Sequence, residues 1–224
     1  MNHSLKLIPV LMLLISPFAF AQEADVKVSH LTDVKSYNLS GQTGIRSNYL
    51  WRGIDQNKHS PMGEVNLEIS KGGAFGGVWI GDVDYNDGSN AELDFYGGYN
   101  FKPIKGVSFS AGATHYEFVD GIDRMSRFTE GFVSAEYKNL LVEYYFDLDT
   151  NVDVQSFYDI KVALPYIPYV DVVLEYGRWE DDSDFKAVNL SKDFGNFTVG
   201  MQTLSSARHG HFWDNAVVQV NYNF

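Results

Sequence analysis

The sequence predicts an all-β fold, a transmembrane antiparallel up-and-down β-barrel of about twelve strands that follows a cleaved signal peptide. Three observations lead to this prediction. Segments of roughly ten residues alternate between apolar and polar side chains, as strands with a lipid face and a lumen face do. Short connections alternate with long ones along the chain. An export signal stands at the start, and the last strand ends on an aromatic residue, Phe224.

Residues 1–21 have the features of a secretory signal peptide. A short, weakly basic stretch precedes an apolar run from Leu7 to Phe20, and Ala19-Phe20-Ala21 fits the small-x-small rule for cleavage before Gln22. The run is too short for a membrane-spanning helix, which needs about 20 residues. We expect a signal peptide over 1–21, a short periplasmic tail or strand extension over 22–36, and an outer-membrane β-barrel over 37–224.

The composition argues against several classes of function. Cysteine is absent, which rules out disulfides and cysteine-based metal sites. The formal net charge of −12 and the lack of a basic stripe argue against nucleic acid as a partner. Gly72-Gly73 and Gly76-Gly77 lack the strand and helix context of a phosphate-binding loop. We therefore expect no cofactor.

Twelve alternating strands are expected in the barrel region. In 91–101 and 140–148, for example, every second residue is apolar or glycine and none of these is charged. A lysine or arginine facing the middle of a bilayer would cost about 2–4 kcal/mol, so such uncharged faces fit lipid contact. The strands expected near residues 45, 79, 134 and 189 alternate poorly. The predicted strand centres lie near residues 45, 66, 79, 96, 111, 134, 144, 160, 174, 189, 200 and 220.

The connections support the strand count independently of hydrophobicity. Short ones, such as Lys71-Gly72-Gly73 and Phe194-Gly195-Asn196, alternate with longer and mostly acidic ones, such as 82–90 and 180–184. Outer-membrane barrels have short periplasmic turns and longer outer loops, so we expect both termini on the periplasmic side. Residues 52–60 belong to the long set by length but not by charge.

A soluble lipocalin-like barrel or β-sandwich would show the same period with its aliphatic face turned inward. Ionisable groups on the polar faces and aromatic residues at the ends of the apolar faces favour the membrane barrel. The closing strand looks like the terminal strand of outer-membrane barrels, which the barrel-assembly machinery recognises. Its expected assembly signal is Tyr222 and Phe224.

Several motifs occur together in the first half of the chain. Residues 47–54 read Ser-Asn-Tyr-Leu-Trp-Arg-Gly-Ile and are followed by Pro61, by Gly77-Val78-Trp79 and by residues 92–99. This set resembles the TorF-like family of small proteobacterial outer-membrane porins. The resemblance is strongest over residues 45–101 and is architectural beyond them. It implies a barrel with a pore and says little about the solute.

The polar faces, taken as lumenal, carry eleven acids against three bases. A low-dielectric wall with excess negative charge concentrates cations and repels anions. We expect a porin-like passive channel for small hydrophilic solutes that prefers cations. The candidate selectivity residues are Arg46, Arg52, Glu64, Glu68, Glu92, Asp94, Tyr96, Glu130, Glu136, Glu143, Asp159, Lys161, Asp171 and Glu175, and Asp147 completes the acids.

Other arrangements of the same residues remain open. The lumenal groups could instead form a polar core that plugs the barrel, since about eight strands are filled by side chains and about 16–18 leave a channel. A non-conducting structural or surface barrel is a related alternative. Arg52 could pair with Glu92 or Asp94 across the wall, as a structural ion pair or as a narrowing of the mouth.

Enzymatic and metal chemistry lack the required patterns. His115 falls on the strand face opposite Ser110, so we expect no catalytic residues, with a lipid-modifying barrel enzyme as the alternative. His209-Gly210-His211 lacks a third ligand, and the acidic stretch 180–184 does not match an EF-hand loop, so we expect no metal site. The expected partners are outer-membrane lipid and lipopolysaccharide, the barrel-assembly machinery and small hydrophilic solutes.

Overall fold

The computed structural model describes residues 36–84, 88–120, 127–149, 154–165, 167–206 and 216–224. The expected signal peptide and almost all of the expected tail lie outside these residues, so both stay predictions. Over the described ranges, no helix is long and apolar enough to cross a membrane.

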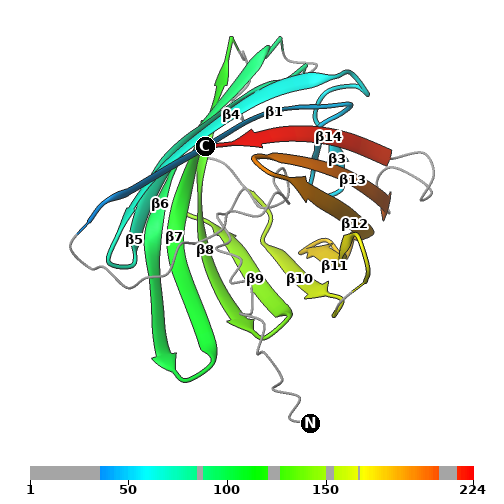
Figure 1. The fold of residues 1–224 in the computed structure, drawn as a ribbon. Helices are drawn as coiled ribbons and strands as arrows, with labels where there is room; N and C mark the ends of the chain where they lie inside the picture. Colours follow the sequence, from blue (N-terminus) through cyan, green and yellow to red (C-terminus); the bar gives the residue numbers. More distant parts are fainter. Residues whose placement is uncertain (1–35, 85–87, 121–126, 150–153, 166, 207–215) are drawn as a thin grey trace.

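Twelve strands pair into one closed antiparallel barrel, in which neighbouring strands follow one another in chain order (Figure 1). Strand β14 pairs with β1 to close the ring. A separate hairpin of β2 (Leu50–Trp51) and β3 (Ile54–Asp55) stands in the connection between β1 and β4. The predicted barrel is confirmed, and each predicted centre falls within a strand. The barrel strands are β1 (Asn38–Arg46), β4 (Met62–Lys71), β5 (Ala74–Asp82), β6 (Ala91–Ile104), β7 (Val107–Val119), β8 (Arg127–Tyr137), β9 (Leu140–Asp147), β10 (Phe157–Ala163), β11 (Asp171–Trp179), β12 (Asp184–Phe194), β13 (Phe197–Ser206) and β14 (Ala216–Asn223).

The alternation along each strand turns apolar side chains outward and polar side chains inward. In β4, Val65 and Leu67 are each 41% exposed, whereas the intervening Glu64 and Asn66 are 4% and 6% exposed. A soluble barrel would bury the aliphatic face instead. The outer wall is therefore largely apolar, as contact with lipid requires. The acids of the predicted lumenal set face inward, whereas Glu117, Arg178 and Lys186 lie on outer strand faces.

Strands that alternate poorly in sequence are held in register by their neighbours. In β5, glycine occupies both faces, at Gly76 and Gly77, which obscures the period. The ladder nevertheless pairs Trp79 with Asn66 on one side and with Asp94 on the other. All three side chains are buried. Because paired residues point to the same face of a sheet, this register fixes Trp79 in the lumen.

The two ends of the barrel differ in their connections. At one end, which we call the short-turn end, most connections are brief, and β4 is joined to β5 by Gly72 and Gly73 alone. Both glycines have positive φ, 58° and 96°, as a type I′ hairpin turn requires. Strand β1 begins and β14 ends here. We call the opposite end the long-loop end; it holds the longer connections, including residues 47–61.

The ring closes where Phe224 meets β1. The Phe224 amide donates to the Gly41 carbonyl at 2.9 Å, and the Gly41 amide donates to the Phe224 carbonyl at 2.8 Å. A Cβ atom at Gly41 would lie 2.4 Å from the Phe224 ring, so the glycine leaves room for the terminal aromatic group. Tyr222 and Phe224 face outward and are exposed. Their role as an assembly signal stays a prediction.

Candidate lumen site

The connection between β1 and β4, residues 47–61, folds into the barrel, and we call it the inner segment. Its Tyr49, Leu50 and Arg52 are only 2–3% exposed. Strands β2 and β3 form its tip, with Arg52 and Gly53 as the turn residues. For residues 52–57 this position differs from the outer loop expected for residues 52–60, whereas residues 58–60 are exposed. The physical reason is that its apolar side chains find a partner surface only inside the barrel.

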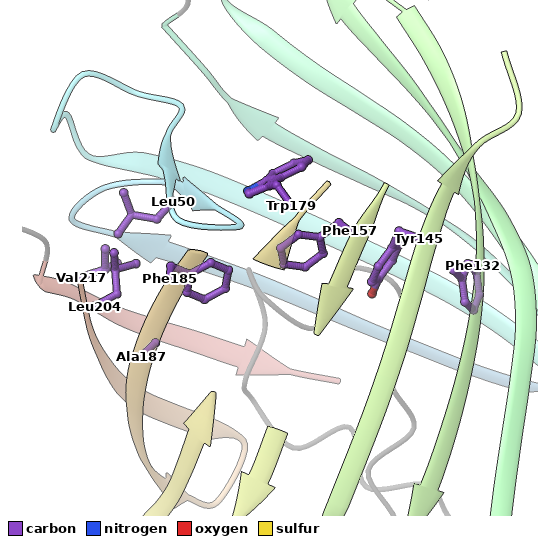
Figure 2. Close-up of a cluster of buried hydrophobic side chains, with 9 residues drawn as sticks. All are labelled: Leu50, Phe132, Tyr145, Phe157, Trp179, Phe185, Ala187, Leu204 and Val217. Atoms are coloured by element: carbon purple, nitrogen blue, oxygen red, sulfur yellow. The ribbon is translucent and has the colours of Figure 1, made fainter. Parts of the chain in front are cut away.

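Two arcs of buried side chains surround the inner segment. Tyr49 joins the first arc and Leu50 the second, while Trp51, like Phe75 of the wall strand β5, packs against both. Three consecutive residues therefore connect opposite sides of the lumen. Figure 2 shows Trp179, Phe157, Tyr145 and Phe132 of the second arc following one another across neighbouring strands. The first arc contains Met62, Trp79, Val83, Tyr96, Tyr116, Phe128 and Val154, and the second contains Phe132, Tyr145, Phe157, Trp179, Phe185, Ala187, Leu204 and Val217.

Arg52 ties the tip of the inner segment to the barrel wall. Its Nη1 and Nη2 atoms donate to Oε1 and Oε2 of Glu130 on β8 at 2.8 and 2.9 Å. Tyr116 donates its hydroxyl to Glu130 Oε2 at 3.0 Å, and Trp179 donates its indole N–H to the Arg52 carbonyl at 3.3 Å. Both charged side chains are 1–2% exposed. Removing one partner from such a buried pair costs about 3–5 kcal/mol.

Four aromatic rings of the described residues surround the Arg52 guanidinium. Its Cζ atom lies 4.1 Å from the ring centroid of Tyr145, 4.5 Å from Trp51, 4.8 Å from Phe157 and 5.6 Å from Trp179. Desolvated cation–π contacts are worth up to about 2 kcal/mol each. Burial works against the charge, but Glu130, Tyr116 and Tyr145 together outweigh it and raise the pKa of Arg52 above its usual value. The guanidinium is therefore a permanently charged anchor.

The backbone of Arg52 shows that its side-chain contacts hold it in place. Its φ of 49° lies in the left-handed region that favours glycine. A non-glycine residue held there costs about 1–3 kcal/mol and persists only when its surroundings compensate. The ion pair with Glu130 and the four rings supply that compensation.

The predicted pairing of Arg52 with Glu92 or Asp94 is wrong. Both carboxylates point into the lumen from β6, but Arg52 reaches Glu130, which lies two strands further round the barrel. The prediction left Arg52 at the end of the first strand, whereas the inner segment carries it into the lumen. Within the described residues, Asp94 has no hydrogen-bond partner for either carboxylate oxygen, and Glu92 has none for Oε2. Arg52 therefore pairs with neither of these two side chains.

Two other predicted bases also form ion pairs with predicted acids. Arg46 on β1 pairs with Glu64 on β4, and Glu64 also accepts the indole N–H of Trp79 at 3.0 Å. On the other side of the barrel, Lys161 lies 3.3 Å from Glu143 and 3.5 Å from Asp159. Each of the three predicted lumenal bases is thus matched by at least one carboxylate.

The remaining candidates are spread along the lumen. Tyr96 donates its hydroxyl to Asn66 at 3.0 Å and lies 3.4 Å from Glu68. Glu175 accepts a hydrogen bond from Asn189 at 2.8 Å. Towards the short-turn end, Glu136 is half-buried and Asp171 is exposed. The structure gives these residues their places, while their part in ion selection stays a prediction.

His115 lies on the outer wall. Its Nδ1 is 2.9 Å from the Thr129 hydroxyl and its Nε2 is 3.4 Å from Glu117. Ser110 points into the lumen from the same strand, so the two side chains lie on opposite sides of the wall. This position offers no support for the lipid-modifying alternative.

The acidic stretch 180–184 is held by internal contacts. Asp182 pairs with Arg178 at 2.5 Å, and the Ser183 amide donates to Asp181 at 3.0 Å. Among the described residues, no group of three or more His, Asp or Glu side chains could hold a metal ion. His209 and His211 lie outside the described residues.

Sequence reasoning missed the rings around Arg52, although a signal for them exists. Tyr145, Phe157 and Trp179 stand on the same strand faces as the lumenal acids Glu143, Asp159 and Glu175, near the long-loop end. A lumen filled by water alone would favour polar groups there. The run Tyr49-Leu50-Trp51 in a non-acidic loop is the matching signal, because it supplies an apolar occupant.

Inward-facing glycines leave room for the aromatic side chains. A Cβ atom at Gly77 would lie 2.4 Å from the Tyr96 ring, and one at Gly177 would lie 2.2 Å from the Phe185 ring. At Gly112 the added atom would meet the Gly97 carbonyl oxygen at 2.3 Å, and backbone cannot move aside as a side chain can. Space for the arcs therefore depends on glycine.

We expect Gly112→Ala to lower the temperature at which the barrel unfolds, since overpacking costs about 1–3 kcal/mol. The matched control is Gly76→Ala on the outer face, where the added Cβ would lie 3.4 Å from the nearest atom. Heat-dependent gel mobility, which separates folded from unfolded barrels, measures both variants. Equal unfolding midpoints would show that the close approach at Gly112 is unimportant.

Comparison with protein families matches the first part of the chain. The family model Gcw_chp, described as a bacterial protein of unknown function, matches residues 32–157, which include the inner segment. That description does not contain the name TorF, so the resemblance to the TorF-like family stays a prediction. No curated protein sequence matches the chain.

Solved porin structures share the fold. The KdgM porin in complex with disordered oligogalacturonate has a TM-score of 0.55 and 8% sequence identity, covering 84% of this chain and 98% of that chain. A second structure of the KdgM porin gives the same values. Outer membrane phospholipase A from Escherichia coli matches with a TM-score of 0.45 and 10% identity over 83% of this chain and 91% of that chain, which is too distant to support an argument. The likeness to KdgM shows that the chain shares the barrel fold of that porin.

Proposed function

Because the chain belongs to the bacterial family Gcw_chp, whose function is unknown, and has a porin-like fold, we propose that it is a passive outer-membrane channel for small hydrophilic solutes. With the inner segment folded against the wall, the lumen is closed. Movement of that segment away from the wall opens a path. The channel needs no energy source, and solutes pass down their own gradients.

The observation that carries this proposal is how the lumen is filled. Barrels of about eight strands are filled by wall side chains, and barrels of about 16–18 strands leave a channel. With twelve strands, this barrel takes in a hairpin in addition to its wall side chains. Without the inner segment, Tyr49, Leu50 and Trp51 would no longer bridge the two arcs. The space that they occupy then becomes available to water and solutes.

Preference for cations follows from the charge on the lumen wall. The predicted lumenal set has eleven acids against three bases, with Arg46 and Lys161 on strands and Arg52 on the inner segment. The three bases lie in ion pairs with Glu64, Glu130, Glu143 and Asp159. Seven acids of the set lie outside these pairs, and each one that is ionised adds negative charge to the wall. Such a wall attracts cations and repels anions along the path.

Neutralising the acids nearest the short-turn end should reduce this preference. Glu136→Gln combined with Asp171→Asn replaces two carboxyl groups on the lumen side of the wall with neutral amides, so the reversal potential in a salt gradient should move towards zero. Glu117→Gln is the control, because Glu117 stands on the outer side of β7 beside His115. Planar-bilayer recordings measure both variants. Equal shifts in both, or anion preference in the parent protein, would contradict the role of the lumenal acids.

Location is tested together with conduction. The full chain, expressed in a Gram-negative host, should be recovered in the detergent-insoluble outer-membrane fraction as a heat-modifiable barrel. Purified protein should then give brief channel openings in a planar bilayer. A freely water-soluble product would contradict the membrane assignment. A folded barrel that never conducts, even with Arg52 replaced, would instead indicate a structural role.

A further inference from the structure

The groups that hold the Arg52 guanidinium belong mainly to the barrel wall. Glu130 stands on β8, Tyr145 on β9, Phe157 on β10 and Trp179 on β11, while Trp51 comes from the inner segment. These four wall strands are consecutive in the ring and joined by backbone ladders. The wall part of the site therefore does not depend on the inner segment for its position.

The chemistry of these groups selects one class of ligand. Two parallel hydrogen bonds to a carboxylate match the planar fork of a guanidinium, which an ammonium ion cannot reproduce. Aromatic rings within about 6 Å favour a weakly hydrated, flat cation. A metal ion is a poor fit, because the Glu130 carboxylate faces the guanidinium at 2.8 and 2.9 Å and the other wall groups around it are rings.

We propose that Glu130, Tyr145, Phe157 and Trp179 form a lumenal binding site for small solutes that carry a guanidinium group, and that Arg52 occupies this site as an internal substitute. The proposal rests on the proposed channel function, because solutes reach the site through the lumen. A solute at the site excludes Arg52, so it favours the state in which the inner segment has moved away. Guanidinium solutes thereby become both ligands and openers of the channel.

The linkage between ligand and closure sets the expected strength of binding. In the parent protein, Arg52 is tethered beside the site at a high effective concentration, so a free solute competes poorly with it. The apparent affinity is further reduced by the small fraction of molecules in the open state. Removing the Arg52 side chain should therefore expose a site that binds free guanidinium compounds far more tightly than the parent protein does.

The test uses the full chain purified in detergent, with methylguanidinium chloride as the probe. Tryptophan fluorescence is the readout, because Trp51 and Trp179 border the site. Arg52→Ala should show saturable binding, at least tenfold tighter than in the parent protein. In Arg52→Ala with Glu130→Gln, binding should weaken again by at least tenfold. Sodium chloride at equal ionic strength controls for salt. Where Arg52→Ala fails to give a heat-modifiable barrel, Arg52→Gln takes its place with the same expectations.

Absence of saturable binding in the folded single variant would overturn the proposal, and so would equal binding in the single and double variants. Binding of tetramethylammonium as tight as that of methylguanidinium would also overturn the proposal, because the two parallel hydrogen bonds to Glu130 would then be irrelevant. Binding is measured without a membrane, so its outcome is separate from conduction. A variant that binds the probe but never conducts refutes the channel, whereas a variant that conducts without binding the probe refutes only this site.

Discussion

Arg52→Met should convert a mostly closed channel into a mostly open one. Methionine replaces arginine with another unbranched side chain but lacks the guanidinium that pairs with Glu130. The two side chains of this pair are only 1–2% exposed. Loss of one partner costs about 3–5 kcal/mol, and about 1.4 kcal/mol corresponds to tenfold in an equilibrium. Withdrawal of the inner segment lets water reach Glu130, so the unpaired carboxylate is unfavourable mainly in the closed state. Much of this cost of about 3–5 kcal/mol therefore shifts the equilibrium towards the open state. We expect the ratio of open to closed time in single-channel recordings to rise at least tenfold.

Lys58→Met is the matched control for this prediction. Lys58 belongs to the same inner segment and pairs with Asp84 at 2.6 Å, but the two side chains are 47% and 55% exposed. Exposed ion pairs contribute about 0–1 kcal/mol. Loss of this pair should therefore change the open fraction little. A similar opening by both substitutions would mean that any change in the inner segment opens the channel, without a special role for Arg52.

A reversal by a second substitution sharpens the argument. Arg52→Met combined with Glu130→Gln leaves neither member of the pair as a buried charge without a partner, and the glutamine carbonyl can still accept the hydroxyl of Tyr116. Replacing a buried pair as a whole is often neutral for stability, whereas removing one member is not. The double variant should therefore be closed for more of the time than Arg52→Met alone. Free energies of opening that simply add between Arg52→Met, Glu130→Gln and the double variant would show that the two side chains do not act as a pair.

A disulfide between the inner segment and β12 should hold the channel closed. The chain has no native cysteine, so two introduced cysteines have no competing partners. A Cβ atom at Gly53 would lie 2.9 Å from the Phe185 Cβ. Disulfides need a separation of about 3.5–4.5 Å, so Gly53→Cys with Phe185→Cys requires a shift of about 1 Å at the hairpin tip. Because Gly53 has a φ of 79°, the new cysteine also carries backbone strain, which that shift can relieve. The oxidised form should lose nearly all openings, because the tip can no longer leave the wall.

The fold was largely predictable from the sequence because two separate signals agree. Alternation in segments such as 140–148 identifies faces that suit lipid, and the alternation of short and long connections gives the number of strands independently. Strands with glycine on both faces, such as β5, gave a weak period. Their register comes from pairing with β4 and β6, which a single strand does not encode.

The lumen site was only partly predictable. The alternation of strand faces placed Glu130 and Arg52 among the lumenal candidates. Their contact, however, joins a loop residue to a strand that begins 75 residues later in the chain, at Arg127. Alternation says which face a strand residue takes and gives no direction for a loop. The direction of the inner segment follows from burial of Tyr49, Leu50 and Trp51 against the two arcs, which is a property of the folded barrel.

The most direct measurement of closure by the inner segment is a recording from one channel before and after reduction. The protein carries Arg52→Met together with Gly53→Cys and Phe185→Cys, so that the oxidised and reduced states share one sequence. We predict silence while the disulfide is intact and sustained openings within the same recording after a reductant is added. Equal conductance in both states would show that ions do not pass where the inner segment lies, and closure of the lumen by this segment would be refuted.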